Sequence, residues 1–540
     1  MRKIDFGKLV VLFTTTVFGL SATSCSDNSE DEKIISNETV VNTNDDAIAV
    51  TAGAYATWSR FSSGYSFIVE SATSGTVSFE GEEDAAGPTI SRLELEPTNS
   101  YFTGVWARNT QAIAAANDAI SKITSSETID AATKRLTIAR NKLIRGLAYS
   151  YLVQLFGEVP LNLTPGAEVT TRSSIDAVYT QIVKDLEEAA ADLPATDATI
   201  SNPSKGTAWA LLSRVYLAWG NNPLSQSQVQ AIVNSRQDPA VSYNTSRLEK
   251  AVEYADKVIN SGVYQLQPNY DDIWGTGNEK KGPEKILTFV KDGDAAGSGN
   301  HQTHCSFTFA FDVQKDNHIG PSNHDRWKNW PEGDVRREWS YTSHLVNGET
   351  GKDVAFLPPV TLPRFGKYID HTYENSFNIC ITKNDLDRVE LRYAEVLLNK
   401  AEALVELGRD NATATALVNQ LQERAFGNDQ HNYASVTLDD IKQEWAYEFT
   451  YEQKSWFNLV RWKQLIADVL SVQNLTYFDQ ANVDAISEQG GDNAAVQFFQ
   501  KVHKHLHAKY DKISGKYYRF PIPTGQSGED LGITPQNPGY

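Results

Sequence analysis

The chain has 540 residues and a formal net charge of −19, and 40% of its residues are hydrophobic and 22% charged. This composition is that of a globular protein, which excludes a disordered chain and a membrane-embedded one. The negative charge argues against a nucleic-acid partner, because binding a phosphate backbone requires clustered Lys and Arg. The length exceeds what one hydrophobic core usually fills, so several domains or an extended repeat architecture is expected.

The first 24 residues have the features of a signal peptide. A basic start at Arg2, Lys3 and Lys8 precedes an apolar run over residues 9–20, which is shorter than the roughly 20 residues of a membrane-spanning helix. Small residues then lead to Cys25 in a pattern that resembles a bacterial lipobox. We therefore expect Cys25 to be acylated as the mature N-terminus, which would anchor the protein to a membrane through lipid chains. An ordinary secretory peptide cut nearby is the alternative.

Residues 25–44 are predicted to be a flexible tether, because they begin with a polar, acidic run that has nothing to bury. Loss of the signal peptide would change the net charge from −19 to −21, since that segment carries three basic residues and one acidic residue. The remaining cysteines, Cys305 and Cys380, could form a disulfide or stay as buried free thiols, and their positions do not decide between the two.

Helical periodicity recurs in two long stretches, about 104–261 and 388–470. Within residues 388–408 the apolar side chains share one helix face; they are Ala394, Leu397, Leu398, Ala401 and Leu404. We expect this helix to stop at Gly408 and a second helix to follow over residues 414–425, which makes a helical hairpin. Similar patterns occur at residues 139–151, 175–186, 206–219 and 248–259.

The expected fold class is mainly α. The hairpins carry small residues at Ala148, Ala208 and Ala401 and resemble degenerate tetratricopeptide repeats, whose helices must stack to bury their apolar faces. Two segments without a helical period, about 62–103 and 262–387, are predicted to be loop-rich insertions on the ligand side of this frame. With a C-terminal segment over residues 471–540, we expect residues 45–540 to form a single unit.

Several segments resemble, in order, the signatures of the SusD/RagB family. They are KLIRGLAYSYLVQLFGEVPL (142–161), KGTAWALLSRVYLAWG (205–220), RVELRYAEVLLNKAEAL (388–404), QEWAYEFTYEQKSWFNLVRWK (443–463) and the terminal FPIP and QNPGY (520–523 and 536–540). The chain departs from the pattern near Trp456, where Lys454 and Ser455 precede the tryptophan and Asn458 replaces the usual Asp. Some of the buried ion pairing of the family is therefore expected to be rearranged.

The resemblance implies a SusD-like fold and a function. Such proteins are outer-membrane lipoproteins of Bacteroidetes that bind glycans or oligosaccharides and act as the lid and partner of a SusC-like TonB-dependent transporter. Neither catalysis nor a cofactor is implied. Peptide or other nutrient binding, as in RagB-like members, is one alternative, and a surface glycoside hydrolase is another.

Acidic residues of the family segments could instead suggest catalysis, since glycosidases use two carboxylates about 5 to 10 Å apart. We expect structural ion pairs, because these acids lie at helical spacing beside basic residues. The residues concerned are Glu395, Lys400, Glu402, Glu448, Glu452 and Arg461.

Three groups have residue types that bind metals. They are residues 301–305 with His301, His304 and Cys305, the acidic start at Asp292 and Asp294, and the alternating His503, His505 and His507. Each group lacks further ligands at the spacing that zinc or calcium requires, so no metal is predicted, and calcium remains a weaker alternative.

Ligand binding is expected to depend on aromatic side chains, because a Trp or Tyr ring covers the apolar face of a sugar while polar groups bond its hydroxyls. The predicted binding residues are Tyr65, Phe79, Trp274, Asn323, Arg326, Trp327 and Trp330; Phe67, Asp325, Asn329 and Trp339 lie beside them. The densest run is residues 322–330, in which Trp327 and Trp330 could form adjacent platforms. The alternative is that these rings pack the insertions onto the helical frame.

Overall fold

The computed structural model describes residues 40–61, 74–75, 77–80, 86–197, 199, 201–274, 282–289, 318–321, 324–341, 367, 388–490, 494–525 and 528–540. The described residues from Val40 to Tyr540 belong to one compact unit. Several predicted positions lie outside the described residues: Cys25, Tyr65, Phe67, Asp292, Asp294, His301, His304, Cys305, Asn323 and Cys380.

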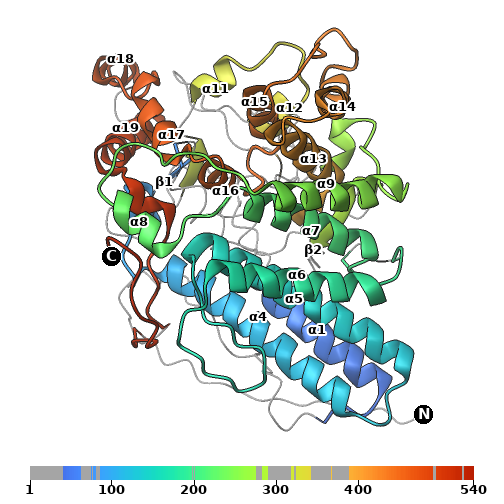
Figure 1. Cartoon of the computed structure of the whole chain (residues 1–540). Helices are drawn as coiled ribbons and strands as arrows, with labels where there is room; N and C mark the ends of the chain where they lie inside the picture. Colours follow the sequence, from blue (N-terminus) through green and yellow to red (C-terminus); the bar gives the residue numbers. More distant parts are fainter. Residues whose placement is uncertain are drawn as a thin grey trace, which may run out of the picture. The chain divides into compact units, whose positions relative to one another are not determined.

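The described part of the chain is mainly helical, which confirms the predicted fold class (Figure 1). The long helices of the frame are α1 (Asn44–Phe61), α4 (Ser100–Ser125), α5 (Ala131–Phe156), α6 (Ile175–Asp192), α7 (Lys205–Gly220), α9 (Thr245–Asn260), α13 (Tyr393–Glu406), α14 (Asn411–Phe426) and α15 (Leu438–Glu448). From α4 to α7 each helix packs against the next, α7 packs against α9, α9 against α13 and α13 against α14. The helices therefore stack in chain order, as repeated helical hairpins would.

The sequence explains where these helices begin and end. Asp130 caps α5, because its Oδ1 accepts hydrogen bonds from the backbone N–H groups of Ala132 (2.8 Å) and Thr133 (2.9 Å). The turn between α13 and α14 contains Gly408 at φ +63°, a left-handed conformation that glycine adopts without steric cost. The predicted stop at this residue is thus confirmed.

One predicted boundary is wrong. The segment from Arg388 was expected to be helical, but Arg388–Arg392 form strand β4, and α13 begins only at Tyr393. Strand β4 pairs antiparallel with β2 (Lys285–Phe289), and both strands are fully buried. The partner strand is distant in the sequence, so local periodicity could not reveal the pairing.

Further elements lie in the insertions, between the long helices and in the C-terminal segment. They are β1 (Val77–Glu80), which pairs antiparallel with β3 (His318–Pro321), and the helices α3 (Ala86–Ser91), α8 (Gln226–Ile232), α11 (His324–Lys328), α12 (Arg336–Ser340), α16 (Ser455–Arg461), α17 (Leu465–Ser471), α18 (Gln480–Gly490) and α19 (Ala494–Lys512). Three 3-10 turns are also present in the described part of the chain: η1 (Tyr270–Ile273), η2 (Val472–Asn474) and η3 (Gly515–Tyr518).

One hydrophobic core connects the early helices with the C-terminal segment. Phe520, which is fully buried, stacks on Phe102 of α4 at 5.3 Å between ring centroids and on Trp456 of α16 at 4.7 Å. Residues hundreds of positions apart thus share one set of contacts, so the C-terminal segment is part of the frame and not an appendage.

Candidate ligand-binding surface

The short helix α12 of the second insertion is held on the frame by a group of buried ion pairs. Arg336 of α12 donates from Nε to both oxygens of Asp334 (2.9 and 3.1 Å) and from Nη1 to Glu448 of α15 (3.1 Å) and to Glu444. Arg336 and its acidic partners have fully buried side chains. Because a buried charge is stable only when paired, this contact fixes α12 against α15.

The charged cluster continues into the sheet and the frame. Arg392 of β4 donates to Glu284 (2.9 Å) and to Glu452 (2.8 Å), and Arg424 of α14 pairs with Glu284 (2.6 Å) and Glu448. Burial alone would raise the pKa of the Glu448 carboxyl, but the three surrounding arginines outweigh burial and lower its pKa well below the usual value. Glu448 therefore stays ionised and serves as the common partner of α12, α14 and β4.

Trp330 and Trp274, two of the predicted binding residues, are buried, which favours a packing role and argues against Trp330 as a platform. Trp330 is 5% exposed, with its ring 4.6 Å from that of Tyr447 and 5.7 Å from that of Tyr341. Trp274 is 4% exposed and lies 6.2 Å from the ring of Tyr270. Trp330 attaches the insertion to α15 of the frame through Tyr447, whereas the ring partner of Trp274 lies in the same insertion. Both rings pack in the interior, which is the role considered as the alternative.

Trp327 of α11 is the predicted tryptophan that remains half-buried. The guanidinium of Arg337 lies 5.0 Å from the centroid of its ring, within the range of a cation–π contact. Neither Trp327 Nε1 nor Arg337 Nε has a hydrogen-bond acceptor among the described residues. We define Trp327 and Arg337, with the neighbouring Asp325 and Arg326 of α11, as the candidate surface.

Other residues of the run 322–330 hold α11 in position. Asp325 Oδ2 accepts a hydrogen bond from the backbone N–H of Thr476 (2.7 Å), and Lys328 lies 5.7 Å from the ring centroid of Tyr477. Asn329 is exposed and Arg326 is half-buried. The contacts tie α11 to the C-terminal segment, which sequence spacing gave no reason to expect.

Two further predicted aromatic residues lie elsewhere. Phe79 lies in β1, opposite Ile319 of β3. Trp339 of α12 donates from Nε1 to Asp271 Oδ1 (2.5 Å). The structure thus does not gather all the predicted aromatic residues in one place.

The conspicuous acids of the family segments form ion pairs, as predicted. Glu395 accepts from Arg214 (Nη2, 2.8 Å) and pairs with Lys454 (3.1 Å), and its side chain is 2% exposed. Glu402 forms two hydrogen bonds of 2.8 Å with Arg461.

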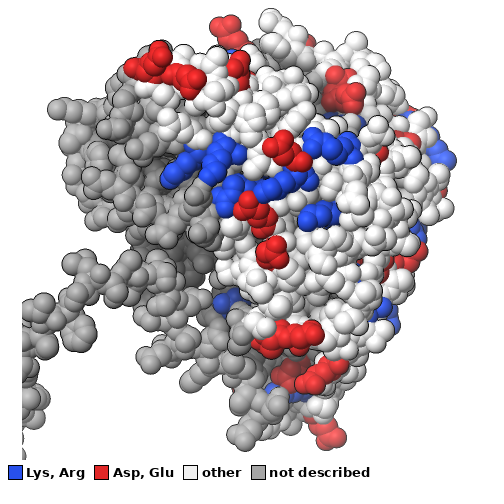
Figure 2. All heavy atoms as spheres, turned by 90° about the vertical axis from the view of Figure 1, so that its left-hand side faces the viewer, with Lys and Arg blue, Asp and Glu red and all other residues white. Residues whose placement is uncertain are grey.

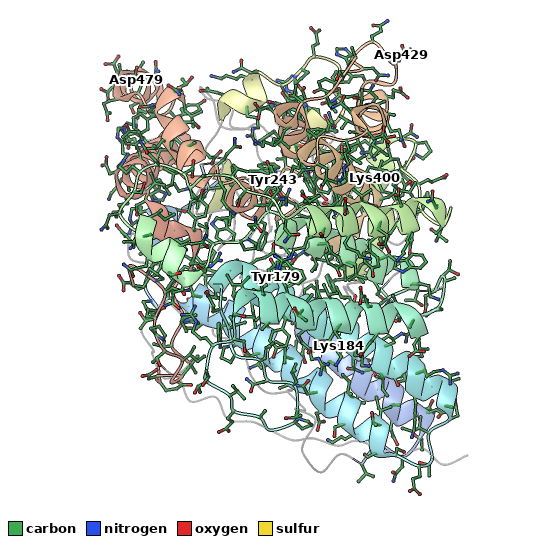
Figure 3. The ribbon with its side chains drawn as sticks, viewed as in Figure 1. Tyr179, Lys184, Tyr243, Lys400, Asp429 and Asp479 are labelled. Carbon is green, nitrogen blue, oxygen red and sulfur yellow. The ribbon has the colours of Figure 1, made fainter. Side chains whose placement is uncertain are left out.

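Some ion-pair partners differ from those that helical spacing predicted. Arg461 of α16 pairs with Glu402 of α13, not with an acid one turn away in the sequence. Lys400, which is labelled in Figure 3, likewise pairs with Asp256 of α9 at 2.6 Å.

Two of the three alternating histidines, His503 and His507, bond to the backbone. They share a helix face, with ring centroids 4.4 Å apart, but His503 Nδ1 and His507 Nε2 bond the carbonyls of Tyr477 (3.0 Å) and Phe478 (2.9 Å). Among the described residues, no group of three or more metal-ligating side chains meets at one point.

Sequence reasoning missed an aromatic ladder on the frame. The rings of Tyr179 and Trp219 stack at 5.4 Å and 8°, Tyr216 and Tyr254 stack at 5.7 Å and 9°, and Arg247 lies 3.8 Å from the Trp219 ring. These residues come from α6, α7 and α9, so only the packing of the helices brings them together. The available signal was the recurrence of aromatic residues on successive amphipathic helices.

Charge is unevenly distributed over the surface. On the face shown in Figure 2, basic side chains gather near the centre and acidic side chains lie above and below them. Within the described ranges, no helix is both long enough and apolar enough to cross a bilayer.

Comparisons with known proteins agree with this architecture. Residues 232–540 match the model of the SusD family, and residues 24–217 match a model described as starch-binding associating with outer membrane. The SusD-like protein P2 of Formosa agariphila is 24% identical over 98% of this chain and 99% of its own length. The starch-binding protein SusD of Bacteroides thetaiotaomicron is 24% identical over 70% of this chain and 73% of its own length.

Solved structures show the same fold. A SusD homologue from Bacteroides thetaiotaomicron superposes with a TM-score of 0.70 at 22% identity, covering 93% of this chain and 98% of that one. A laminarin-binding SusD-like protein gives a TM-score of 0.65 at 21% identity, covering 92% and 100%. Since the family model matches more than half of the chain, the resemblance found in the sequence is confirmed: the chain belongs to the SusD family.

Proposed function

We propose that this protein binds glycans at the outer surface of a bacterial cell and delivers them to a SusC-like TonB-dependent transporter, without catalysis. In this proposal residues 1–24 are removed and Cys25 carries the lipid anchor. The tether was expected to extend to residue 44, but Val41 is buried and α1 begins at Asn44, so we place its end before Val40, where the compact unit begins. The outer membrane is the expected location, with the binding unit facing outward.

The names of similar proteins support a carbohydrate ligand. Relatives are described as starch-binding and laminarin-binding, and another similar structure contains a xylogluco-oligosaccharide. These glycans differ in linkage, so the fold is compatible with several glucans. The ligand of this chain is thus proposed at the level of a glycan.

The observation that carries the proposal is the half-buried Trp327 with Arg337 beside its ring. An indole face can cover the apolar face of a sugar, and the guanidinium of Arg337, 5.0 Å from the ring centroid, brings hydrogen-bond donors beside that face. The buried Arg336 and Trp330 hold both helices in place, so the platform is pre-organised and loses little entropy on binding.

Calorimetric titration against a panel of glucan oligosaccharides and peptides tests the proposal. We expect a glucan to bind wild-type protein, and Trp327→Ala to weaken binding roughly tenfold or more, which corresponds to about 1.4 kcal/mol. Tyr243→Ala is a matched control, because Tyr243 is an exposed aromatic residue outside the candidate surface (Figure 3). Equal affinities of the two variants would reject Trp327 as the platform.

The same panel separates the alternatives. Binding of peptides but not glycans would favour a peptide carrier. Release of shorter sugars from a bound glycan by protein free of other hydrolases would show an enzyme. Co-purification with a TonB-dependent transporter encoded beside this chain tests the partner, and an isolated monomer from gently solubilised membranes would contradict it.

A further inference from the structure

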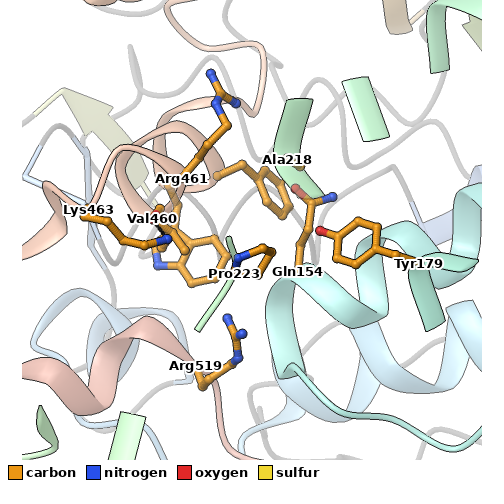
Figure 4. Close-up of a pocket in the computed structure, with 10 residues that line it drawn as sticks. Gln154, Tyr179, Ala218, Pro223, Val460, Arg461, Lys463 and Arg519 are labelled. Atoms are coloured by element: carbon orange, nitrogen blue, oxygen red, sulfur yellow. Dashed lines mark hydrogen bonds between the residues drawn. The ribbon is translucent and has the colours of Figure 1, made fainter. Parts of the chain in front are cut away.

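A small cavity lies where the C-terminal segment meets the helical frame (Figure 4). Its volume is about 30 Å³, and its lining includes Tyr179, Trp456, Arg461, Lys463 and Arg519. One water needs roughly 10–15 Å³ in such a cavity, whereas pockets for organic ligands are typically about 300 Å³ or more. The cavity can therefore hold one or two water molecules or an ion of similar size, and it is too small for a sugar ring.

Two of the lining side chains are buried cations. Lys463 is 5% exposed and Arg519 is 2% exposed, and neither forms an ion pair within 4 Å of a carboxylate in the part of the chain that the structure describes. Arg461, the third cation, is by contrast fully engaged by Glu402 and Asn458. An unpaired buried charge costs several kcal/mol, so Lys463 and Arg519 require compensation.

The hydrogen bonds of both cations are incomplete. Lys463 Nζ has only long contacts, to the carbonyls of Asn221 (3.3 Å) and Val460 (3.4 Å). Arg519 donates to the carbonyls of Tyr518 (3.1 Å) and Leu224, and its Nε has no acceptor among the described residues. Carbonyl oxygens are dipoles without net charge, so they leave the two positive charges uncompensated.

The carboxylates that act on these cations from a distance are held by other residues, and each keeps one buried oxygen, Glu158 Oε2 and Glu406 Oε1, without a hydrogen-bond partner among the described residues. Glu158, which acts on Arg519, accepts from the N–H of Gln226 (2.9 Å) and lies 3.7 Å from Arg172. Glu406, which acts on Lys463, accepts from Asn221 (3.0 Å). Burial and the nearby Glu402 raise the pKa of Glu406 to about 8, so this carboxyl is mostly protonated near neutral pH.

The pKa of Lys463 reflects its burial near other positive charges. Burial, followed by repulsion from Arg519 and Arg461, lowers the pKa of its ammonium group to about 7. A negative charge in the cavity would counter both effects and keep the lysine charged.

We propose that this cavity binds a small monovalent anion of the halide class, held between the Lys463 ammonium and the Arg519 guanidinium. The anion joins the turn after α16, which carries Lys463, to the C-terminal segment, which carries Arg519. It is a structural ligand, separate from the candidate glycan surface on α11 and α12.

Thermal unfolding in sodium chloride and in sodium methanesulfonate of equal ionic strength tests the proposal in solution. For wild type we expect a saturable rise in Tm of about 2 °C or more with chloride, since a ligand stabilises the state that binds it. Lys463→Met should abolish the difference between the salts. Lys501→Met, at an exposed position on α19, should retain it. An equal response of all three proteins would overturn the proposal.

Crystals of the wild-type protein in bromide give a second measurement that does not depend on the folding of a variant. We expect an anomalous peak in the cavity in contact with Lys463 Nζ. Water density without an anomalous peak would mean that Lys463 is neutral and hydrated, and would refute the anion site.

Discussion

The Arg336 guanidinium of α12 and the Glu444 carboxylate of α15 form an ion pair in which both side chains are completely buried. The two residues are 108 positions apart and join the second insertion to the helical frame. Burial raises the pKa of Glu444, and Arg336 opposes this effect. Docking of the second insertion on the helical frame therefore depends on this ion pair.

Replacing Arg336 by methionine should strongly destabilise the protein. Removing Arg336 leaves Asp334 and Glu444 buried without a cationic partner, whereas Glu448 keeps Arg392 and Arg424. Breaking a buried pair in this way typically costs about 3–5 kcal/mol. Chemical denaturation monitored by tryptophan fluorescence measures the change. Arg409→Met is the control, because Arg409 and its partner Glu249 are 55% and 47% exposed and such a pair contributes about 0–1 kcal/mol. Similar losses in both variants would contradict the prediction.

Glu395 should make the fold sensitive to acid. Burial alone would raise the pKa of its carboxyl, but Arg214 and Lys454 outweigh burial and lower it from 4.5 to about 2. A depressed folded-state pKa gives stability that is present above pH 4.5 and is lost as the pH falls towards 2. The shift corresponds to roughly 3 kcal/mol.

We therefore expect the free energy of unfolding of wild type to exceed that of Glu395→Gln by roughly 3 kcal/mol at pH 6, and the difference to shrink between pH 4.5 and pH 2. Denaturation curves at several pH values measure it. A difference that does not change with pH would show that Glu395 is not ionised in the folded protein.

Trp330 and Trp327 should respond differently to substitution by alanine. Trp330 is buried between Tyr341 and Tyr447, so its removal opens a cavity and should cost about 3–5 kcal/mol of folding stability. Trp327 is only half-buried and should affect ligand affinity more than stability. Measuring Tm and ligand affinity for both variants checks the contrast. If Trp327→Ala lowered Tm more and Trp330→Ala lowered affinity more, the packing and binding roles would have to be exchanged.

Gly157 should not tolerate alanine. Its φ is +79°, and a Cβ at this position would lie 2.5 Å from Arg519 Nε. Gly166→Ala is the control, because φ is +68° there but nothing lies within 4 Å of the added atom. The control should lose about 1–2 kcal/mol from the left-handed conformation alone, and Gly157→Ala clearly more. Equal losses of Tm would mean that Arg519 moves aside without cost.

Cys25→Ala should release the protein from the membrane, because lipid chains on this residue are the proposed anchor. Phase separation in detergent, followed by immunoblotting, measures the distribution. Wild type should enter the detergent phase and the variant the aqueous phase. A variant that stays with detergent would locate the anchor elsewhere.

The candidate surface was only partly predictable. The residue run 322–330 includes α11, but spacing could not separate Trp327 from Trp330, since both lie on one short stretch. What separates them is contact with Tyr447 and Tyr341, and these residues approach only after α15 and α12 have docked. The cavity beside Lys463 and Arg519 left no pattern in the sequence, because its walls come from distant segments.

The sequence by itself determined the helical hairpins, the end of α13 at Gly408 and the family, because these features depend on local periodicity, on backbone freedom at one glycine and on contiguous motifs. Only the tertiary structure decided that Arg388–Arg392 form a strand, that Glu402 pairs with Arg461, and which tryptophan is buried. Such features depend on residues far away in the sequence. The burial of a charged or aromatic side chain, and so its contribution to stability, is determined only when those residues come into contact with it.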